Sequence, residues 1–137
     1  MKVREIMTAN VECVSPDTDL IELANKMKTL DVGFSPICEN DRLVGTVTDR
    51  DIVIRGLASG RDIDTCTSRD VMTQDIFYCF EEDDVKDVAE KMRDREVRRM
   101  LILNRDKRLV GVVSIGDISK VEEKVSGKVL RDITEAA

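Results

Sequence analysis

The sequence predicts an α/β fold in which one β-α-β-β-α unit is used twice, the two units packing through their sheets about an approximate two-fold axis. Two observations predict it: segment 4–8 (REIMT) recurs as 69–73 (RDVMT), and segment 43–48 (LVGTVT) recurs as 109–114 (LVGVVS). One unit of roughly 60 residues buries too little apolar surface to be stable alone. We therefore expect the two units to cover each other's sheet faces, with a cleft between them where a ligand could bind.

The first half of the first repeat predicts a strand and a helix. Residues 11–14 favour a short strand, which Ser15 and Pro16 end. Asp17 or Thr18 can cap the helix that follows. Apolar residues at spacings of three and four predict its buried stripe: Leu20, Leu23, Ala24, Met27 and Leu30.

The remaining elements follow in the same order in both repeats. In the first we expect a strand over 32–38, a turn at 39–41, a strand over 43–48, and a helix from Asp49 that Gly60 stops. In the second we expect strand 76–80, helix 84–95, strand 99–103, turn 104–107, strand 109–114 and helix 118–125. The predicted domains are repeat 1 (1–66), repeat 2 (67–128) and a C-terminal tail (129–137).

Composition predicts a soluble protein with a packed core. Hydrophobic residues make up 42% and charged residues 36% of the 137 residues. Such a composition is typical of globular chains rather than disordered ones. No apolar run approaches the ~20 residues of a membrane span, and the N-terminus lacks the apolar core of a signal peptide. We expect a cytoplasmic protein with no membrane partner.

Charge and residue usage exclude several classes of function. The net charge of −6 disfavours a nucleic-acid binder, because such proteins neutralise phosphates with basic residues. The chain has no histidine, and its four cysteines (13, 38, 66 and 79) form no CxxC pair, so we expect no metal site. In a cytoplasmic setting these cysteines are expected to be buried thiols rather than disulfides.

A pattern Gly-x-x-[Thr/Ser]-x-x-Asp occurs once in each repeat. It places Gly45, Thr48 and Asp51 in the first repeat, where a strand leads into a helix, and the second repeat has its equivalent at 111–117. The glycine allows a ligand or a backbone to approach closely, and a carboxylate at this place can accept hydrogen bonds from the two hydroxyls of a ribose. The alternative is a helix capping box made by the same side chains. The two roles can coexist.

These features together resemble a tandem pair of cystathionine β-synthase (CBS) domains, of the stand-alone bacterial and archaeal type. The resemblance rests on the Met-Thr openings, Ser15-Pro16-Asp17, the segment 33–37 (GFSPI) and the repeated glycine-hydroxyl-acid pattern, and it covers roughly residues 3 to 130. It implies a homodimeric regulatory module that binds an adenine nucleotide (AMP, ADP or ATP) or a related adenosyl ligand between the repeats. It also implies an unknown protein effector, because the chain carries no output domain.

The resemblance also implies two composite ligand sites. In each, a hydroxyl and an acid hold the ribose, while the opposite repeat supplies contacts to adenine and phosphate. The first site comprises Thr48, Asp51, Ile76, Phe77, Arg98 and Arg99. The second comprises Val11, Glu12, Phe34, Arg50, Ser114 and Asp117.

The two sites are predicted to differ in charge. Arg98 and Arg99 give the first site permanently charged, bidentate donors for phosphate. The matching positions at the second site are Gly33 and Phe34, so a phosphorylated nucleotide is expected to prefer the first. Leu101 stands where the family usually has a proline. The alternative for the two arginines is that they are an ordinary pair of solvent-exposed surface residues.

A second class of function stays open, a ligand-free adaptor that serves only dimerisation or protein interaction. Without histidine, an activated cysteine or a readable pair of catalytic carboxylates, the sequence gives no support for an enzyme or for a catalytic cofactor.

Overall fold

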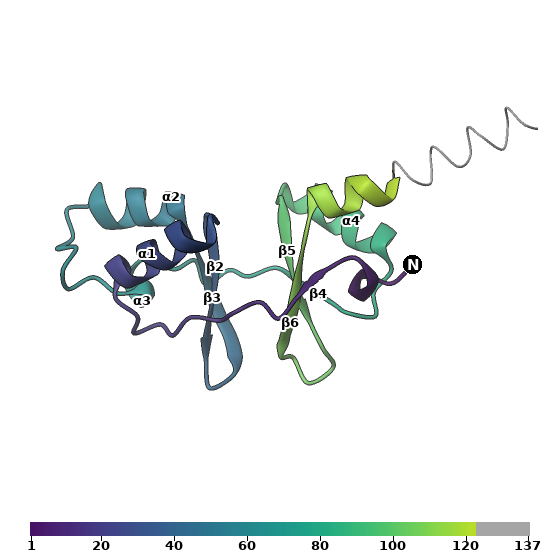
Figure 1. Cartoon of the computed structure of the whole chain (residues 1–137), viewed down its shortest axis with the longest axis horizontal. Helices are drawn as coiled ribbons and strands as arrows, with labels where there is room; N and C mark the ends of the chain where they lie inside the picture. Colours follow the sequence, from purple (N-terminus) through teal and green to yellow (C-terminus); the bar gives the residue numbers. More distant parts are fainter. Residues whose placement is uncertain (123–137) are drawn as a thin grey trace, which may run out of the picture. The chain divides into compact units, whose positions relative to one another are not determined.

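The computed structural model describes residues 1–122 (Figure 1). The chain forms two compact units, each of mixed α/β structure. Among the described residues, unit 1 contains Met1–Val11 and 77–122, and unit 2 contains Glu12–Ile76. The predicted α/β class is confirmed. The units do not coincide with the sequence repeats, because the leading segment of each repeat belongs to the unit built mainly from the other repeat.

Unit 1 is built around a four-stranded sheet in the order β1-β6-β5-β4. β4 runs parallel to β5, and the other neighbours are antiparallel. Figure 1 shows the N-terminal segment, in purple, running beside β6. The elements are η1 (Val3–Glu5, a 3₁₀ turn), β1 (Thr8–Ala9), β4 (Tyr78–Phe80), α4 (Val85–Arg95), β5 (Arg99–Leu103), β6 (Leu109–Ser114) and a helix from residue 115 through 122.

Unit 2 repeats this plan with shorter pairing. β2 and β3 form an antiparallel hairpin, and isolated bridges add Val14 beside Ile37 and Thr73 beside Thr46. The order Thr73-β3-β2-Val14 therefore matches β1-β6-β5-β4 of unit 1. The elements are α1 (Leu20–Leu30), β2 (Phe34–Glu39), β3 (Arg42–Thr48), α2 (Asp49–Asp51), η2 (Ile52–Leu57, a π-helix) and α3 (Ser68–Val71).

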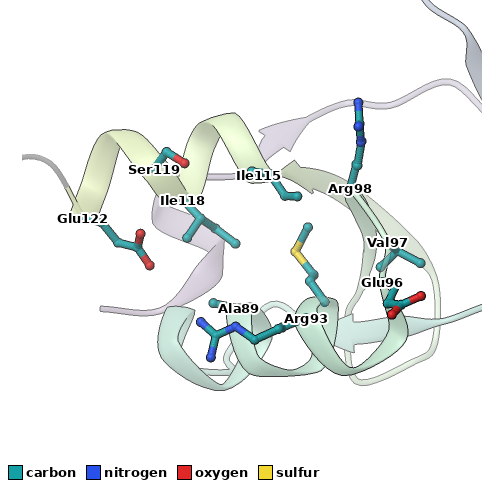
Figure 2. A pocket seen from close by; sticks show the side chains of 10 residues that line it. Ala89, Arg93, Glu96, Val97, Arg98, Ile115, Ile118, Ser119 and Glu122 are labelled. Atoms are coloured by element: carbon teal, nitrogen blue, oxygen red, sulfur yellow. The ribbon is translucent and has the colours of Figure 1, made fainter.

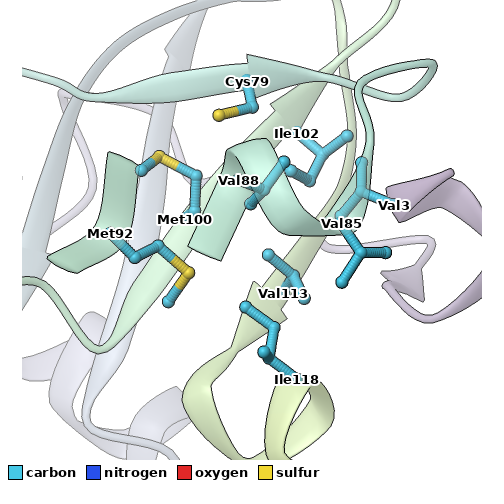
Figure 3. Packing of buried hydrophobic residues seen from close by; sticks show 9 residues of the cluster. All are labelled: Val3, Cys79, Val85, Val88, Met92, Met100, Ile102, Val113 and Ile118. Carbon is cyan, nitrogen blue, oxygen red and sulfur yellow. The ribbon is translucent and has the colours of Figure 1, made fainter. Parts of the chain in front are cut away.

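The core of unit 1 lies between its sheet and α4 (Figure 3). Val3, from the far N-terminus, is fully buried, and its backbone N–H donates to the carbonyl of Asp83 at 2.8 Å. The leading segment is thus part of this core. The buried residues of the cluster are Val3, Cys79, Val85, Val88, Met92, Met100, Ile102, Val113 and Ile118.

The core of unit 2 is the equivalent cluster. It includes Val71 and Met72, the leading segment of the second repeat, so each core is completed by the segment that opens the other repeat. The buried residues of the cluster are Val14, Leu20, Leu23, Met27, Ile37, Val47, Cys66, Val71 and Met72.

The predicted start of α1 is wrong by one to two residues. The N-cap is Asp19, not Asp17 or Thr18. The physical reason is tertiary: the carbonyl of Thr18 accepts from the N–H of Ser68 at 2.9 Å, and the N–H of Leu20 donates to the carbonyl of Cys66 at 2.9 Å. The predicted stripe is also too wide, because Ala24 and Leu30 are exposed.

Other predicted boundaries also change, among them the strand over 32–38, which begins at Phe34 and ends at Glu39. The strand expected over 11–14 is reduced to the single bridge at Val14, and the strand over 76–80 begins at Tyr78. The last helix begins at residue 115 rather than 118, and its expected end at 125 lies outside the described residues. The turn at 39–41 and the strands 99–103 and 109–114 are confirmed, with Asn40 and Asp41 both at positive φ in the turn.

The expectation that no cysteine forms a disulfide is wrong for two of the four. Cys13 and Cys38 are joined by a disulfide, whereas Cys66 and Cys79 are buried thiols. The N–H of Cys38 donates to the carbonyl of Val14 at 2.9 Å, so the backbone already brings the two segments together. Burial raises the pKa of both free thiols, which keeps them protonated and unreactive at neutral pH.

Candidate functional site

Thr48 and Asp51 form a reciprocal capping box where β3 leads into α2. The backbone N–H of Thr48 donates to Asp51 Oδ2 at 2.9 Å, and the backbone N–H of Asp51 donates to Thr48 Oγ1 at 3.1 Å. These bonds satisfy two N–H groups at the helix start that have no helical partner. The capping alternative considered for the sequence pattern is therefore present in the structure.

The capping box leaves one hydroxyl donor and one carboxylate oxygen that could contact the hydroxyls of a sugar. The hydroxyl of Thr48 accepts a hydrogen bond through its oxygen and so keeps its own O–H for donation. Asp51 uses Oδ2 for the cap, and its other oxygen, Oδ1, lies 3.9 Å from Arg55 Nε. The Asp51 side chain is 14% exposed, so it is sheltered but reachable.

Ser114 and Asp117 repeat this geometry in unit 1. The N–H of Ser114 donates to Asp117 Oδ2 at 2.9 Å, and the N–H of Asp117 donates to Ser114 Oγ at 3.1 Å. The distances equal those in unit 2. Two matching hydroxyl–carboxylate pairs thus stand at the starts of two matching helices.

The glycine of each motif makes room for the chain itself. A Cβ on Gly45 would lie 2.9 Å from the carbonyl oxygen of Thr73 and 2.9 Å from Met72 Sδ. A Cβ on Gly111 would lie 2.8 Å from the carbonyl oxygen of Thr8 and 2.6 Å from Met7 Sδ. The sequence left open whether a ligand or a backbone approaches this glycine. The structure shows a backbone in both units, that of the segment that opens the other repeat.

Arg98 and Arg99 line a hollow of about 470 Å³ in unit 1 together with Ser114, Ile115 and Gly116. Arg99 is the register partner of Ser114 across β5 and β6, and the N–H of Ile115 donates to the carbonyl of Arg98 at 3.0 Å. Two arginines and the start of a helix thus line the same hollow, and both kinds of group are suited to contact an anion. The sequence had assigned these arginines and Ser114 to different sites.

Phe77 and Ile76, the expected adenine contacts of the first site, are both half-buried. In unit 1, the guanidinium carbon of Arg95 lies 4.4 Å from the centre of the Phe77 ring. This is a cation–π contact, and it covers one face of the ring expected to meet adenine. Arg95 was not singled out from the sequence, although its place in the basic last turn of α4 was visible there.

The residues expected at the second site belong to both units: Val11, Ser114 and Asp117 lie in unit 1, and Glu12, Phe34 and Arg50 lie in unit 2. Phe34 is the register partner of Thr48, and exposed Arg50 follows Thr48 by two residues, so both lie beside the Thr48/Asp51 pair. Glu12 pairs with Lys26 at 2.7 Å, and this hydrogen bond lowers the pKa of the Glu12 carboxyl. Val11 is half-buried.

A second hollow of unit 1, of about 410 Å³, lies between α4 and the helix that begins at residue 115. Figure 2 shows Ile115 and Ile118 extending from that helix on the side that faces α4, where Ala89 lies, while Arg98 points away from them. Charged side chains, including Arg93 and Glu122, stand at its rim. Apolar side chains, among them Met92 and Ile118, line this hollow. It adjoins the hollow lined by Arg98 and Arg99, with which it shares Arg98 and Ile115.

Within residues 1–122, no three cysteine, aspartate or glutamate side chains gather as metal ligands would. In the same part of the chain no helix has the length and apolar content of a membrane span.

Comparison with known proteins gives a family model described as "CBS domain", which matches residues 3–57 and again 69–124. Hypoxic response protein 1 of Mycobacterium tuberculosis is 39% identical over 118 residues, covering 85% of this chain and 82% of that protein. A crystal structure of this relative with two coordinated zinc ions has a TM-score of 0.79 and 38% identity, covering 88% of this chain and 98% of that one.

Two more distant solved structures share the fold and hold adenosyl ligands. CBSX2 in complex with AMP has a TM-score of 0.77 and 21% identity, covering 91% of this chain and 98% of its own. The CBS domain pair of protein MJ0100, with 5′-methylthioadenosine and S-adenosyl-L-methionine, has a TM-score of 0.77 and 24% identity, covering 88% of this chain and 98% of its own.

Proposed function

Because the chain belongs to the CBS domain family, we propose that it is a regulatory module that binds an adenine nucleotide or a related adenosyl ligand. The observation that carries this proposal is the pair of identical hydroxyl–carboxylate arrangements at Thr48/Asp51 and Ser114/Asp117. A capping box accounts for the hydrogen bonds within each pair. The same arrangement retained in both repeats, each with an oxygen and a hydroxyl left for a ribose, supports a ligand role as well.

In this proposal, one site uses Thr48, Asp51, Ile76, Phe77, Arg98 and Arg99, and the other uses Val11, Glu12, Phe34, Arg50, Ser114 and Asp117. The ligands held by CBSX2 and by the MJ0100 domain pair support the chemical class. The presence of Arg98 and Arg99 in one hollow supports a phosphate-bearing member of that class, AMP or ATP.

Calorimetric titration of the full chain with AMP, ATP and S-adenosyl-L-methionine tests this proposal. We expect micromolar binding of at least one ligand, about −8 kcal/mol, and loss of one stoichiometric site in each of Asp51→Ala and Asp117→Ala. No binding of any of the three ligands by a folded chain would contradict the proposal.

Arg99→Ala decides which sugar motif shares the two arginines. In an Asp117→Ala background, weaker AMP binding assigns them to the Thr48/Asp51 site. In an Asp51→Ala background, weaker AMP binding assigns them to the Ser114/Asp117 site, with which Arg99 shares a hollow. Adenosine, which lacks the phosphate, is the matched control and should lose no affinity.

The second candidate is a ligand-free adaptor, and the satisfied capping boxes favour it, because they give each motif a purely structural use. A thermal-shift screen separates the two functions. A ligand at 100 times its Kd stabilises the folded state by about 2.7 kcal/mol and raises the Tm, whereas the adaptor shows no such rise with any adenosyl compound.

We also propose that the chain acts as a homodimer in the cytoplasm, without catalysis of its own, and passes its signal to a partner protein. Exposed apolar side chains on η2, namely Val53, Ile54 and Leu57, support a self-association surface. Lack of ATP turnover by the pure protein tests the absence of catalysis. Extraction of the protein from cells in the presence of a thiol-blocking reagent tests the compartment. Because a reducing cytoplasm disfavours the Cys13–Cys38 disulfide, cytoplasmic protein should carry both cysteines as blocked thiols.

A further inference from the structure

Arg55 is the side chain that links the acid of the first sugar motif to the leading segment of the second repeat. Its Nε lies 3.9 Å from Asp51 Oδ1, and its Nη1 donates to the backbone carbonyl of Met72 at 3.1 Å. Asp51 Oδ2 is already held by the N–H of Thr48. Both oxygens of the carboxylate therefore have a neighbour that restrains them.

The oxygen beside Arg55 is the one that a ligand would use. Oδ2 already accepts the hydrogen bond of the cap, so we expect a ribose hydroxyl to donate to Oδ1, the oxygen 3.9 Å from the guanidinium. A carboxylate that is held in one orientation before the ligand arrives loses less entropy on binding. Arg55 itself is 51% exposed, and most of its five N–H donors point to neither Asp51 nor Met72.

The backbone around Arg55 is unusual. Residues Ile52–Leu57 form a π-helix, in which the N–H of Ala58 donates to the carbonyl of Val53 at 2.8 Å. Single π turns inside helices occur frequently at functional sites. In the second repeat, Val121 occupies the position that matches Arg55, so within the described residues no cation stands four positions after Asp117.

We propose that Arg55 is a positioning residue that orients Asp51 for a ribose hydroxyl and so makes the Thr48/Asp51 motif bind an adenosine moiety more tightly than the Ser114/Asp117 motif. This inference rests on the proposed function. Arg55 acts through Asp51, so its effect does not depend on a phosphate in the ligand.

The test uses the full chain carrying Asp117→Ala, in which the first motif alone is intact. We expect Arg55→Leu to weaken adenosine and AMP binding by the same factor, about two- to fivefold, the range expected for one partly exposed ion pair. Arg55→Lys, which keeps the charge, should recover part of the loss. In an Asp51→Ala background, which leaves the second motif, Arg55→Leu should change neither affinity.

Arg61→Leu is the matched control. Arg61 is 48% exposed in the same unit and also pairs with an acid, Asp70, at 4.0 Å. It should leave both affinities unchanged, although it can lower stability as much as Arg55→Leu does. The comparison separates positioning from a general loss of fold stability.

Three results would overturn the inference. Equal affinities of the Arg55→Leu variant and its parent would show that the arginine does not position Asp51. A loss for AMP alone would make Arg55 a direct phosphate ligand. If the Asp117→Ala parent binds neither adenosine nor AMP, the proposed function fails at this site, and the inference fails with it.

Discussion

The capping role of Thr48 can be measured separately from the ligand role that we propose for it. Its hydroxyl caps α2 by accepting from the N–H of Asp51. We predict that Thr48→Ala lowers the free energy of unfolding by about 1 kcal/mol, whereas Thr48→Ser, which keeps the hydroxyl, retains most of it. Urea unfolding followed by circular dichroism measures both. An unchanged unfolding curve for Thr48→Ala would mean that this cap contributes nothing to stability.

Asp84, the N-cap of α4, predicts a dependence of stability on acid pH. Its pKa is lowered mainly by a hydrogen bond from the N–H of Lys86, at 2.9 Å, and further by the N-terminal ammonium group, whose nitrogen lies 3.6 Å from Asp84 Oδ2. A lowered folded-state pKa means that the stabilisation is present above the ordinary value of 3.8 and is lost as the pH falls through the folded-state value.

Asp84→Asn keeps an acceptor for the cap and removes the charge. We expect its Tm to fall less steeply than that of the parent chain as the pH falls below about 5. Differential scanning calorimetry across that range measures the difference. If the Tm of the two proteins falls equally steeply with decreasing pH, Asp84 is not a source of the pH dependence.

At the scale of elements, the contact between β3 and the leading segment of the second repeat predicts a sensitive glycine. The N–H of Thr46 donates to the carbonyl of Thr73 at 3.0 Å, and Thr73 returns the bond at 2.8 Å. Gly45→Ala would place a Cβ 2.9 Å from that same carbonyl oxygen, which belongs to backbone and cannot rotate away. We expect a loss of about 1–3 kcal/mol in the free energy of unfolding.

Gly116→Ala is the control for this prediction. Its Cβ would lie 3.5 Å from Ser114 Oγ, an ordinary van der Waals distance, in a helix that favours alanine over glycine. Chemical denaturation should therefore show a lower free energy of unfolding for Gly45→Ala and an unchanged or higher one for Gly116→Ala. A Gly45→Ala variant as stable as Gly116→Ala would contradict the close packing of Met72 and Thr73 on β3.

The elements that the sequence predicts best are those determined by their own residues. The strands 99–103 and 109–114 follow from dense apolar runs, and the turn at 39–41 from residues that tolerate positive φ. Tertiary bonds decide the others. The helix α1 begins late because the carbonyl of Thr18 and the N–H of Leu20 pair with the distant segment 66–68, and no local pattern contains that information.

At the scale of the whole molecule, the disulfide predicts a redox-dependent stability. Cys13 and Cys38 are 25 residues apart, and closing a loop of that length stabilises a fold by about 3 kcal/mol. We expect Cys13→Ser/Cys38→Ser, or reduction of the unaltered chain, to lower the Tm of unit 2. Thermal unfolding with and without reductant measures it, and the double variant should show no further response to reductant.

The proposed self-association can be tested by measuring the mass of the protein in solution. Leu57 is 57% exposed on η2, beside exposed Val53 and Ile54. We expect Leu57→Asp to shift the chain from dimer to monomer, because a buried charge at an apolar interface is costly. Size-exclusion chromatography with light scattering gives the mass directly. A parent chain that is already monomeric at micromolar concentration would contradict the predicted homodimer.

The candidate site could be predicted from the sequence only in part. The hydroxyl and acid of each motif lie three residues apart, so local geometry joins them, as expected. The neighbours of Arg99 could not be read from spacing, because strand register rather than sequence distance places Ser114 opposite it. Arg55 was overlooked although it follows Asp51 by four residues, one helical turn, because its link to Met72 spans 17 positions.

The exchange of leading segments has a consequence for how such a chain can be divided. Thr8 and Ala9 pair with β6, and Thr73 pairs with β3, so a cut between the two sequence repeats would leave each fragment carrying the edge strand of the other. Neither fragment could then complete its own sheet, yet the pair mixed in solution would hold every missing piece. A protein with a single repeat would complete its sheet only by exchanging its N-terminal segment with a second copy. Fusion of two such repeats into one chain would make that exchange intramolecular.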